Sequence, residues 1–209
     1  MGEPIDEEVP PTIDRILDLL DLEVIDRDLY RGRNPKNRWN HRVFGGQVAA
    51  QALRAATLTV ETDHSPHSLH SYFLRPGKPG VPIVFLVQRI RDGKSFTTRT
   101  VIARQHGEAI FSLAASFHRS EAGGEYQIPP ATVPRPDEPT GFTETILRRF
   151  NTASPFEVRE LGPDGPDDNG VFTSARRVWI RTRGEMPDDP DLHACMLTYV
   201  SDMGVVFAA

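Results

Sequence analysis

Cysteine is almost absent from this sequence of 209 residues, and the single Cys195 excludes an internal disulfide bond. Residues 1–9 are polar and acidic and lack the apolar core of a secretory signal. No stretch approaches the roughly 18 consecutive apolar residues that a membrane-spanning helix needs. These three absences favour a protein of the reducing cytoplasm that has no membrane span.

An excess of basic residues is also missing. The chain has 24 Lys and Arg against 29 Asp and Glu, which gives a net charge of −5. Because nucleic-acid-binding proteins usually carry a basic surplus, we expect no nucleic-acid partner. The hydrophobic fraction of 38% is lean but sufficient for a packed core.

Several signatures of catalytic chemistry do not occur. The sequence has no Gly-x-Ser-x-Gly elbow for a nucleophilic serine and no Gly-rich phosphate loop of the P-loop kind. His and Cys residues do not recur at the spacing of a zinc site, so we expect no metal. Serine-hydrolase, P-loop and zinc chemistry are therefore disfavoured.

The first half predicts a sheet built around one helix. A short helix is expected after Thr12, a strand over Leu22–Arg31, a basic loop over Arg31–Arg42, and an alanine-rich buried helix from Gly45 to about Val60. Asp92-Gly93 and His106-Gly107 then mark hairpin turns between strands. The four expected strands after the helix are Ser68–Leu74, Ile83–Ile90, Ser95–Ala103 and Ala109–Phe117.

The second half repeats part of this order, which suggests an internal duplication. A short helix is expected over Glu144–Phe150, strands over Phe156–Leu161 and Val171–Arg183, and a further helix after the Asp189-Pro190 cap. The chain ends at Ala209, before a second set of strands. We expect a flexible leader (1–11), a first sheet-and-helix unit (12–118), a Pro/Gly-rich connector (119–143) and an incomplete second unit (144–209).

Several motifs, in order along the chain, resemble the type II acyl-CoA thioesterase family. The resemblance runs from about Leu19 to Gly204 and is weakest across the connector. The matching motifs are Arg42-Val43-Phe44-Gly45-Gly46-Gln47-Val48, His70-Ser71-Tyr72-Phe73-Leu74-Arg75-Pro76-Gly77, Arg91-Asp92-Gly93-Lys94-Ser95-Phe96, Ala114-Ala115-Ser116-Phe117, Arg177-Val178-Trp179-Ile180-Arg181 and Tyr199-Val200-Ser201-Asp202.

This resemblance implies an α+β double hot-dog fold, in which an antiparallel sheet wraps around a central helix, here with the second unit truncated after its helix. It implies hydrolysis of acyl-CoA to free acid and CoA without a cofactor. Asp202 matches the family's water-activating Asp, whereas the accompanying Thr and Gln would lie beyond Ala209. Hot-dog units usually pair edge to edge, so we expect a homo-oligomer.

Other residues have two interpretations each. Gly45 and Gly46 open a helix and either hold an anion or permit tight packing, and packing is favoured. Gln47 could orient a water but is expected on the helix surface, and His70 could act as a base but is expected as a structural strand residue. Cys195 is expected as a small buried hydrophobe rather than a nucleophile. Residues Arg31–Arg42 and Arg75–Lys78 are candidates for meeting the CoA phosphates, unless they form a solvated charged face.

Two rival functions remain open at this point. A non-catalytic acyl-CoA binding or assembly module would bind the thioester without releasing thiol. A hot-dog hydratase or dehydratase would need an Asp/His pair within one unit, and the motifs do not supply one.

Overall fold

The structure is a computed structural model that describes residues 12–36, 41–129, 132–138, 154–161 and 177–203. The chain forms two compact units, and each is described by itself. The sheet unit comprises Ile16–Tyr126 and Pro187–Val205. The hairpin unit comprises the remaining residues, and its described strands are β7 (Phe156–Leu161) and β8 (Arg177–Thr182), which pair antiparallel.

The sheet unit contains one antiparallel sheet with the strand order β1-β2-β4-β5-β6-β3. Strands β4, β5 and β6 form the meander predicted from the two turn signals, and β3 returns to pair with β6. His106 and Gly107 both have positive φ angles, 50° and 82°, as a tight turn between β5 and β6 requires. The strands are β1 (Glu23–Asp26), β2 (Leu29–Gly32), β3 (His64–Phe73), β4 (Ile83–Asp92), β5 (Phe96–Gln105) and β6 (Glu108–Arg119).

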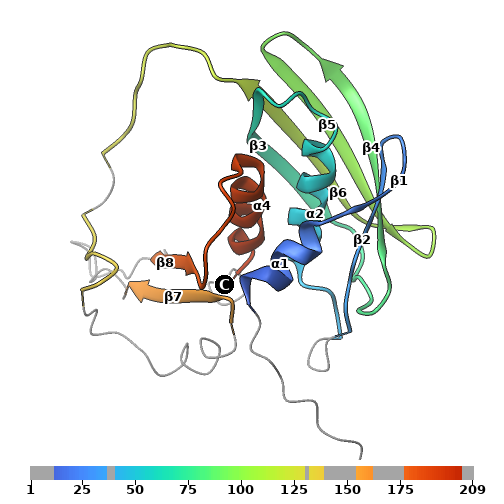
Figure 1. Ribbon diagram of the computed structural model, residues 1–209, viewed down its shortest axis with the longest axis horizontal. Helices are drawn as coiled ribbons and strands as arrows, with labels where there is room; N and C mark the ends of the chain where they lie inside the picture. Colours follow the sequence, from blue (N-terminus) through green and yellow to red (C-terminus); the bar gives the residue numbers. More distant parts are fainter. Residues whose placement is uncertain (1–11, 37–40, 130–131, 139–153, 162–176, 204–209) are drawn as a thin grey trace, which may run out of the picture. The chain divides into compact units, whose positions relative to one another are not determined.

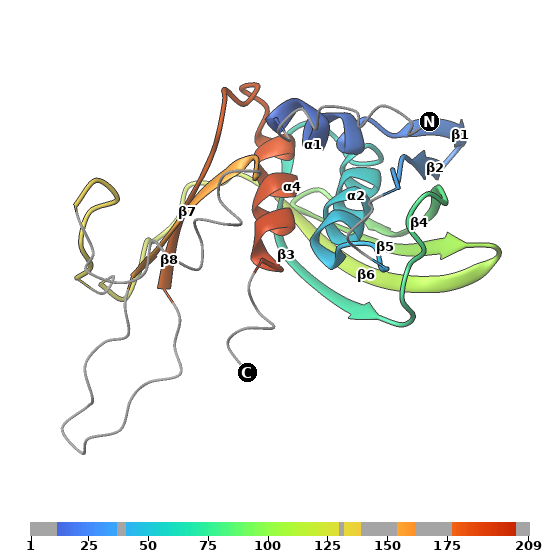
Figure 2. The same cartoon turned by 90° about the horizontal axis from the view of Figure 1, so that it is seen from below.

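Helix α2 (Gly45–Thr57) lies against the concave face of this curved sheet (Figures 1 and 2). Its alanines allow close approach to the strands, and Ala50, Ala52, Ala55 and Ala56 have no exposed surface. Phe85, Val101 and Phe117 supply the large side chains from the sheet. An antiparallel sheet wrapped around one buried helix is the hot-dog arrangement that the sequence predicted.

A second helix, α4 (Pro190–Ser201), packs beside α2 within the same unit (Figure 1). The predicted cap is present, because the Asp189 carboxylate accepts hydrogen bonds from the backbone N–H groups of Asp191 and Leu192. Pro190 occupies the first helical turn, where its missing N–H costs nothing. Cys195 is completely buried in the core between the helices.

One strand prediction was wrong. The segment Leu22–Arg31 is not a single strand but a hairpin of β1 and β2, whose turn contains Asp28 at a φ of 58°. Two contacts hold this turn against β4: Val87 donates its N–H to the Asp28 carbonyl at 2.8 Å, and Arg89 makes a bidentate ion pair with the Asp28 carboxylate. These contacts come from a strand that is distant in the sequence, and the local sequence contains no glycine that would indicate a turn.

Some of the other predicted helices and strands can be compared with the structure, and others lie outside the described residues. Helix α1 (Ile13–Leu20) and strand β7 occur where they were expected, and β8 lies in the described part of the strand expected over Val171–Arg183. Apart from Arg119, which ends β6, the described parts of the connector contain no helix or strand. The helix expected at Glu144–Phe150 and the acidic loop at Gly162–Gly170 lie outside the described residues. None of the described helices is long and apolar enough to cross a membrane.

The end of α2 opposite to Gly45 is fixed by a buried arginine. The Arg99 side chain is 1% exposed, and its guanidinium donates to the Thr59 hydroxyl at 2.8 Å and the Thr59 carbonyl at 2.9 Å. It also donates to the Arg91 carbonyl at 3.0 Å and contacts the Asp92 carboxylate. One side chain therefore joins the segment after α2 to the hairpin of β4 and β5.

Replacing Arg99 with leucine is expected to lower the free energy of unfolding by about 2–4 kcal/mol, because buried carbonyl groups lose their donors. Urea titration followed by circular dichroism measures this change. Arg104→Leu, at an exposed position on the same strand, is the matched control and should stay within about 0.5 kcal/mol. Equal losses in the two variants would show that Arg99 does not anchor the helix.

Candidate active site

The Asp202 carboxylate lies at the point where helix α4 ends and helix α2 begins. Asp202 is the C-cap residue of α4, and its Oδ2 accepts a hydrogen bond from the Gly46 N–H at 2.9 Å. Gly46 is in the first turn of α2, where backbone N–H groups have no partner within the helix and carry partial positive charge. A carboxylate at the end of one helix therefore faces the positive end of another.

Burial raises the pKa of Asp202 above its ordinary value of 3.8, while the hydrogen bond from Gly46 opposes this shift. The C-terminal end of α4 also disfavours the charged form of Asp202, whereas the N-terminus of α2, which has the opposite sign, stabilises it. A carboxylate with a raised pKa is a better proton acceptor than an ordinary exposed aspartate.

The two glycines at the start of α2 permit this approach. A Cβ atom added at Gly46 would lie 2.2 Å from the Tyr199 carbonyl oxygen, and one added at Gly45 would lie 2.7 Å from Asp202 Oδ2. Both distances are far below normal contact, so a side chain at Gly46 would push α4 away, and one at Gly45 would displace the Asp202 carboxylate and the Phe73 ring. The packing interpretation of the glycines is thus correct but incomplete, because Gly46 also binds the carboxylate.

Aromatic rings lie beside the start of α2, where the carboxylate is bound. The rings of Phe44 and Tyr199 are 5.0 Å apart, and those of Phe73 and Phe111 are 5.1 Å apart. Phe73 also lies close to Gly45, since an added Cβ there would be 2.8 Å from its ring. Burial raises the pKa of the Tyr199 phenol to about 12, so this hydroxyl stays protonated at neutral pH. Together these rings create a partly apolar setting around one ionisable group.

The other sequence candidates lie elsewhere or act structurally. His70 is exposed on β3, with its ring 4.7 Å from that of Tyr72. Burial raises the pKa of the Cys195 thiol to about 12, which makes it an inert core residue as expected. The expectation of a surface Gln47 was wrong: it is 9% exposed and contacts the Arg33 carbonyl at 3.4 Å.

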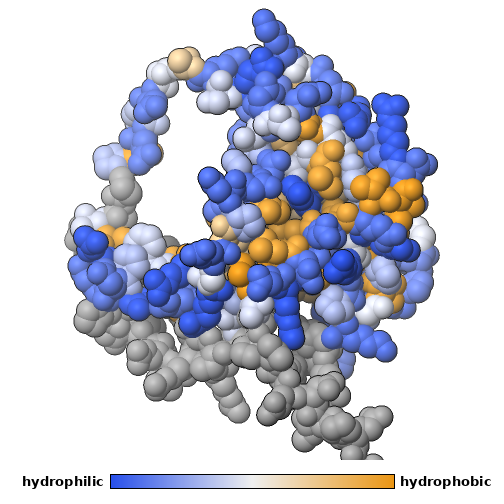
Figure 3. Space-filling view, viewed as in Figure 1, coloured by the Kyte–Doolittle hydropathy of each residue, from blue (hydrophilic) through white to orange (hydrophobic). Residues whose placement is uncertain are grey.

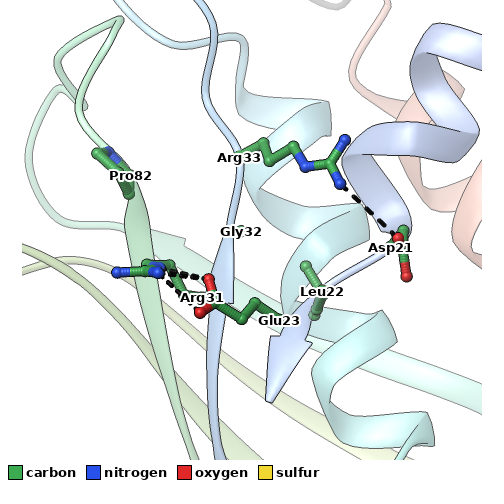
Figure 4. Close-up of a pocket in the computed structure, with 7 residues that line it drawn as sticks. All are labelled: Asp21, Leu22, Glu23, Arg31, Gly32, Arg33 and Pro82. Carbon is green, nitrogen blue, oxygen red and sulfur yellow. Dashed lines mark hydrogen bonds and ion pairs between the residues drawn. The ribbon is translucent and has the colours of Figure 1, made fainter. Parts of the chain in front are cut away.

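A surface pocket of about 280 Å³ lies beside β1 and β2, and Asp202 is not among its lining residues (Figure 4). Its two arginines already have acidic partners. Arg31 makes a bidentate ion pair with Glu23 at 2.7 Å, and Arg33 lies 3.9 Å from the Asp21 carboxylate. Because these charges are compensated, the pocket offers no free cation to an anionic ligand, and Arg31 is a poor candidate for phosphate binding.

Among the residues that the structure describes, no three His, Cys, Asp or Glu side chains are grouped closely enough to hold a metal ion. The polar contact that the structure shows at this site is the one between the Asp202 carboxylate and the Gly46 N–H. The sequence singled out Asp202 and the Gly45-Gly46 pair separately, but it did not indicate that they meet. The Gly-Gly pair was the available signal for the contact between the helices, whereas Phe73 carried none.

Two family models match, one described as the acyl-CoA thioesterase N-terminal domain over residues 35–118, and one described as acyl-CoA thioesterase over residues 157–209. A solved structure, the acyl-CoA thioesterase II TesB2 from Mycobacterium marinum, is 39% identical with a TM-score of 0.73, over 93% of this chain and 69% of that one.

Two curated relatives are similar along most of this chain. Acyl-coenzyme A thioesterase 8 of Rattus norvegicus is 35% identical over 90% of this chain and 64% of the relative. Acyl-CoA thioesterase 2 of Haemophilus influenzae is 34% identical over 94% of this chain and 72% of the relative. The chain thus spans a little less than two thirds of the rat protein's length.

The class defined by the curved sheet and its buried helix is the hot-dog fold, as in the solved relatives. Within that class, the chain belongs to the type II acyl-CoA thioesterase family. The family and the fold predicted from the sequence motifs are both confirmed.

Replacing Gly46 with alanine tests the close approach of the two helices. Helix propensity alone favours alanine by about 1 kcal/mol, but the clash with the Tyr199 carbonyl should reverse the sign and destabilise the fold by about 2–3 kcal/mol. Thermal unfolding measures the difference. Gly124→Ala is the control, because no atom lies within 4 Å of its added Cβ. A stabilised Gly46→Ala protein would contradict the packing described for α2 and α4.

Proposed function

We propose that this protein hydrolyses acyl-CoA thioesters to a free acid and CoA, with Asp202 as the general base. The observation that carries the proposal is the half-buried Asp202 carboxylate at the N-terminus of α2. The names of the matched families and relatives support the reaction class. The substrate named in those families, acyl-CoA, is part of the proposal for this chain.

The proposed reaction needs one proton acceptor and one donor to the developing oxyanion. In the structure, Oδ2 of Asp202 is used by Gly46, and among the described residues nothing donates to Oδ1. A water bound at Oδ1 attacks the thioester carbonyl and passes its proton to the carboxylate. The C–S bond then breaks, and the CoA sulfur takes up that proton as it leaves.

The N-terminus of α2 supplies the electrostatic part of this proposal. Its N–H groups carry partial positive charge and lie beside the carboxylate, where the carbonyl oxygen becomes negative during attack. The acyl chain is proposed to lie across Phe73 and Leu69, which are 58% and 40% exposed and point from β3 to the same side as buried Phe111. The thioester carbonyl then lies beside backbone N–H donors, and the acyl chain lies on an apolar surface.

Asp202→Asn is expected to reduce thiol release from a fatty acyl-CoA by at least about 100-fold, because the amide cannot accept the proton. Asparagine keeps an oxygen for the Gly46 N–H, so the unfolding temperature should not fall. Asp191→Asn is the matched control, since burial also raises the pKa of Asp191 at the other end of α4. Equal rates in Asp202→Asn and the parent protein would remove Asp202 from the mechanism.

The same variant tests the pH dependence. Activity of the parent should rise with pH through the raised pKa of Asp202, because only the carboxylate accepts a proton. A raised pKa also means that ionising Asp202 costs stability as pH increases from 3.8 through the folded value. At neutral pH, Asp202→Asn should therefore be at least as stable as the parent.

Binding of acyl-CoA without any thiol release from the parent would favour the non-catalytic binding module instead.

From its composition, the protein is proposed to lie in the cytoplasm.

We also propose that it forms a homo-oligomer through the edge strand β3. Strand β3 is an edge of the sheet, ten residues long, and exposes Leu69, Tyr72 and Phe73. The opposite edge, β1, is only four residues long, although apolar side chains also gather near it (Figure 3). A long unpaired edge with apolar side chains is a ready site for strand pairing.

Light scattering should therefore give a mass above that of one chain, and Leu69→Lys with Tyr72→Lys should shift the protein towards the monomer. The charged pair opposes strand pairing because it must be desolvated at the edge. Val24→Lys with Ile25→Lys, on the β1 edge, is the control and should leave the mass unchanged. A parent protein that is monomeric at working concentration would rule out the β3 edge as an interface.

A further inference from the structure

Two loops near the start of α2 are held together by buried amide side chains. Asn34 donates to the carbonyls of Lys78 and Val81, both at 2.8 Å. Gln105 donates to the same two carbonyls at 3.1 Å and 2.7 Å, and accepts from the Lys78 N–H at 2.7 Å. Asn34 and Gln105, here called the amide clamp, are 8% and 6% exposed. Residues 33–36 and 77–81 are thus fixed to each other and to β5.

The clamped loops carry cations that have no acidic partner. Lys36, Arg42 and Lys78 are exposed and form no ion pair within the described part of the chain. The neighbouring arginines differ, because Arg33 lies 3.6 Å from Asp18 and Arg75 lies 3.7 Å from Glu108. The three unpaired cations are here called the cation rim. Its charge is available to a ligand.

The cation rim is held close together. The stem of Lys36 lies against Gly80, since an added Cβ there would be 2.6 Å from Lys36 Cγ. The Val43 N–H donates to the Gly77 carbonyl at 3.0 Å, which places Arg42 beside the loop of Lys78. Four extended residues span at most about 14 Å, so Arg42 lies within that distance of Gly46, whose N–H binds the Asp202 carboxylate.

We infer that the cation rim binds the phosphate groups of the CoA nucleotide. This inference rests on the proposed function and assigns the part of the substrate that does not react. Phosphates carry several negative charges and accept charge-assisted hydrogen bonds from lysine and arginine. The amide clamp holds glycine- and proline-containing loops in one conformation before binding, which lowers the entropic cost of capturing a flexible ligand. Asn34 and Gln105 are positioning residues in this assignment.

The test compares two pairs of substitutions that remove the same charge. Lys36→Gln with Lys78→Gln should raise KM for an acyl-CoA by about fivefold, with kcat unchanged. KM for the corresponding acyl-pantetheine, which lacks the nucleotide, should not change. Arg31→Gln with Arg33→Gln is the control and should leave both KM values at the parental level. An unchanged KM for acyl-CoA in the lysine variant would overturn the assignment.

Binding of adenosine 3′,5′-bisphosphate to the full chain, measured by calorimetry, separates this inference from the proposed function. Weaker binding by the lysine variant than by the arginine control supports the cation rim, whether or not any thioester is hydrolysed. Equal binding by the two variants, or no binding by the parent, refutes it. If the parent protein releases no thiol from acyl-pantetheine, the hydrolytic function is refuted, whereas the inference about phosphate binding is not affected.

Discussion

The close approach of α2 and α4 is the constraint on which the candidate site depends. Only a glycine at position 46 allows the carbonyl of Tyr199 to come so near, and only that approach brings Asp202 within hydrogen-bonding distance of a backbone N–H. The alanines of α2 likewise permit close approach of neighbouring elements along the rest of the helix. Small side chains on one helix therefore determine where a carboxylate on another helix lies.

Charge in this unit is distributed in two ways. Arg31 is paired with an acid on the neighbouring strand β1, Arg89 with an acid in the turn between β1 and β2, and Arg99 is buried with its donors satisfied. In contrast, Asp202 accepts a hydrogen bond from a backbone N–H, and within the described part of the chain Lys36 and Lys78 form no ion pair. These three charges lie near the N-terminal end of α2, where both the reaction and the ligand are proposed to be.

The sequence was sufficient for much of the fold because its signals were local. Local residues favour the observed backbone geometry at the turns of Asp92-Gly93 and His106-Gly107 and at the Asp189 cap. The turn at Asp28 was missed because Val87 and Arg89 stabilise it from another strand. Gln47 was misplaced for a similar reason, since its burial depends on a loop that packs over the helix. For the site, the motif indicated Asp202, but its partner Gly46 lies far away in the chain.

The anchoring of α2 by Arg99 has a consequence for how the protein responds to different substrates. With one terminus tied to the β4–β5 hairpin and the other packed against Tyr199, the helix cannot slide along its axis. With the acyl chain lying across β3 as proposed, discrimination between short and long acyl groups comes from side-chain rotamers such as that of Phe73. Variation in chain-length preference among close homologues should accordingly map to the β3 surface and leave the helix register untouched.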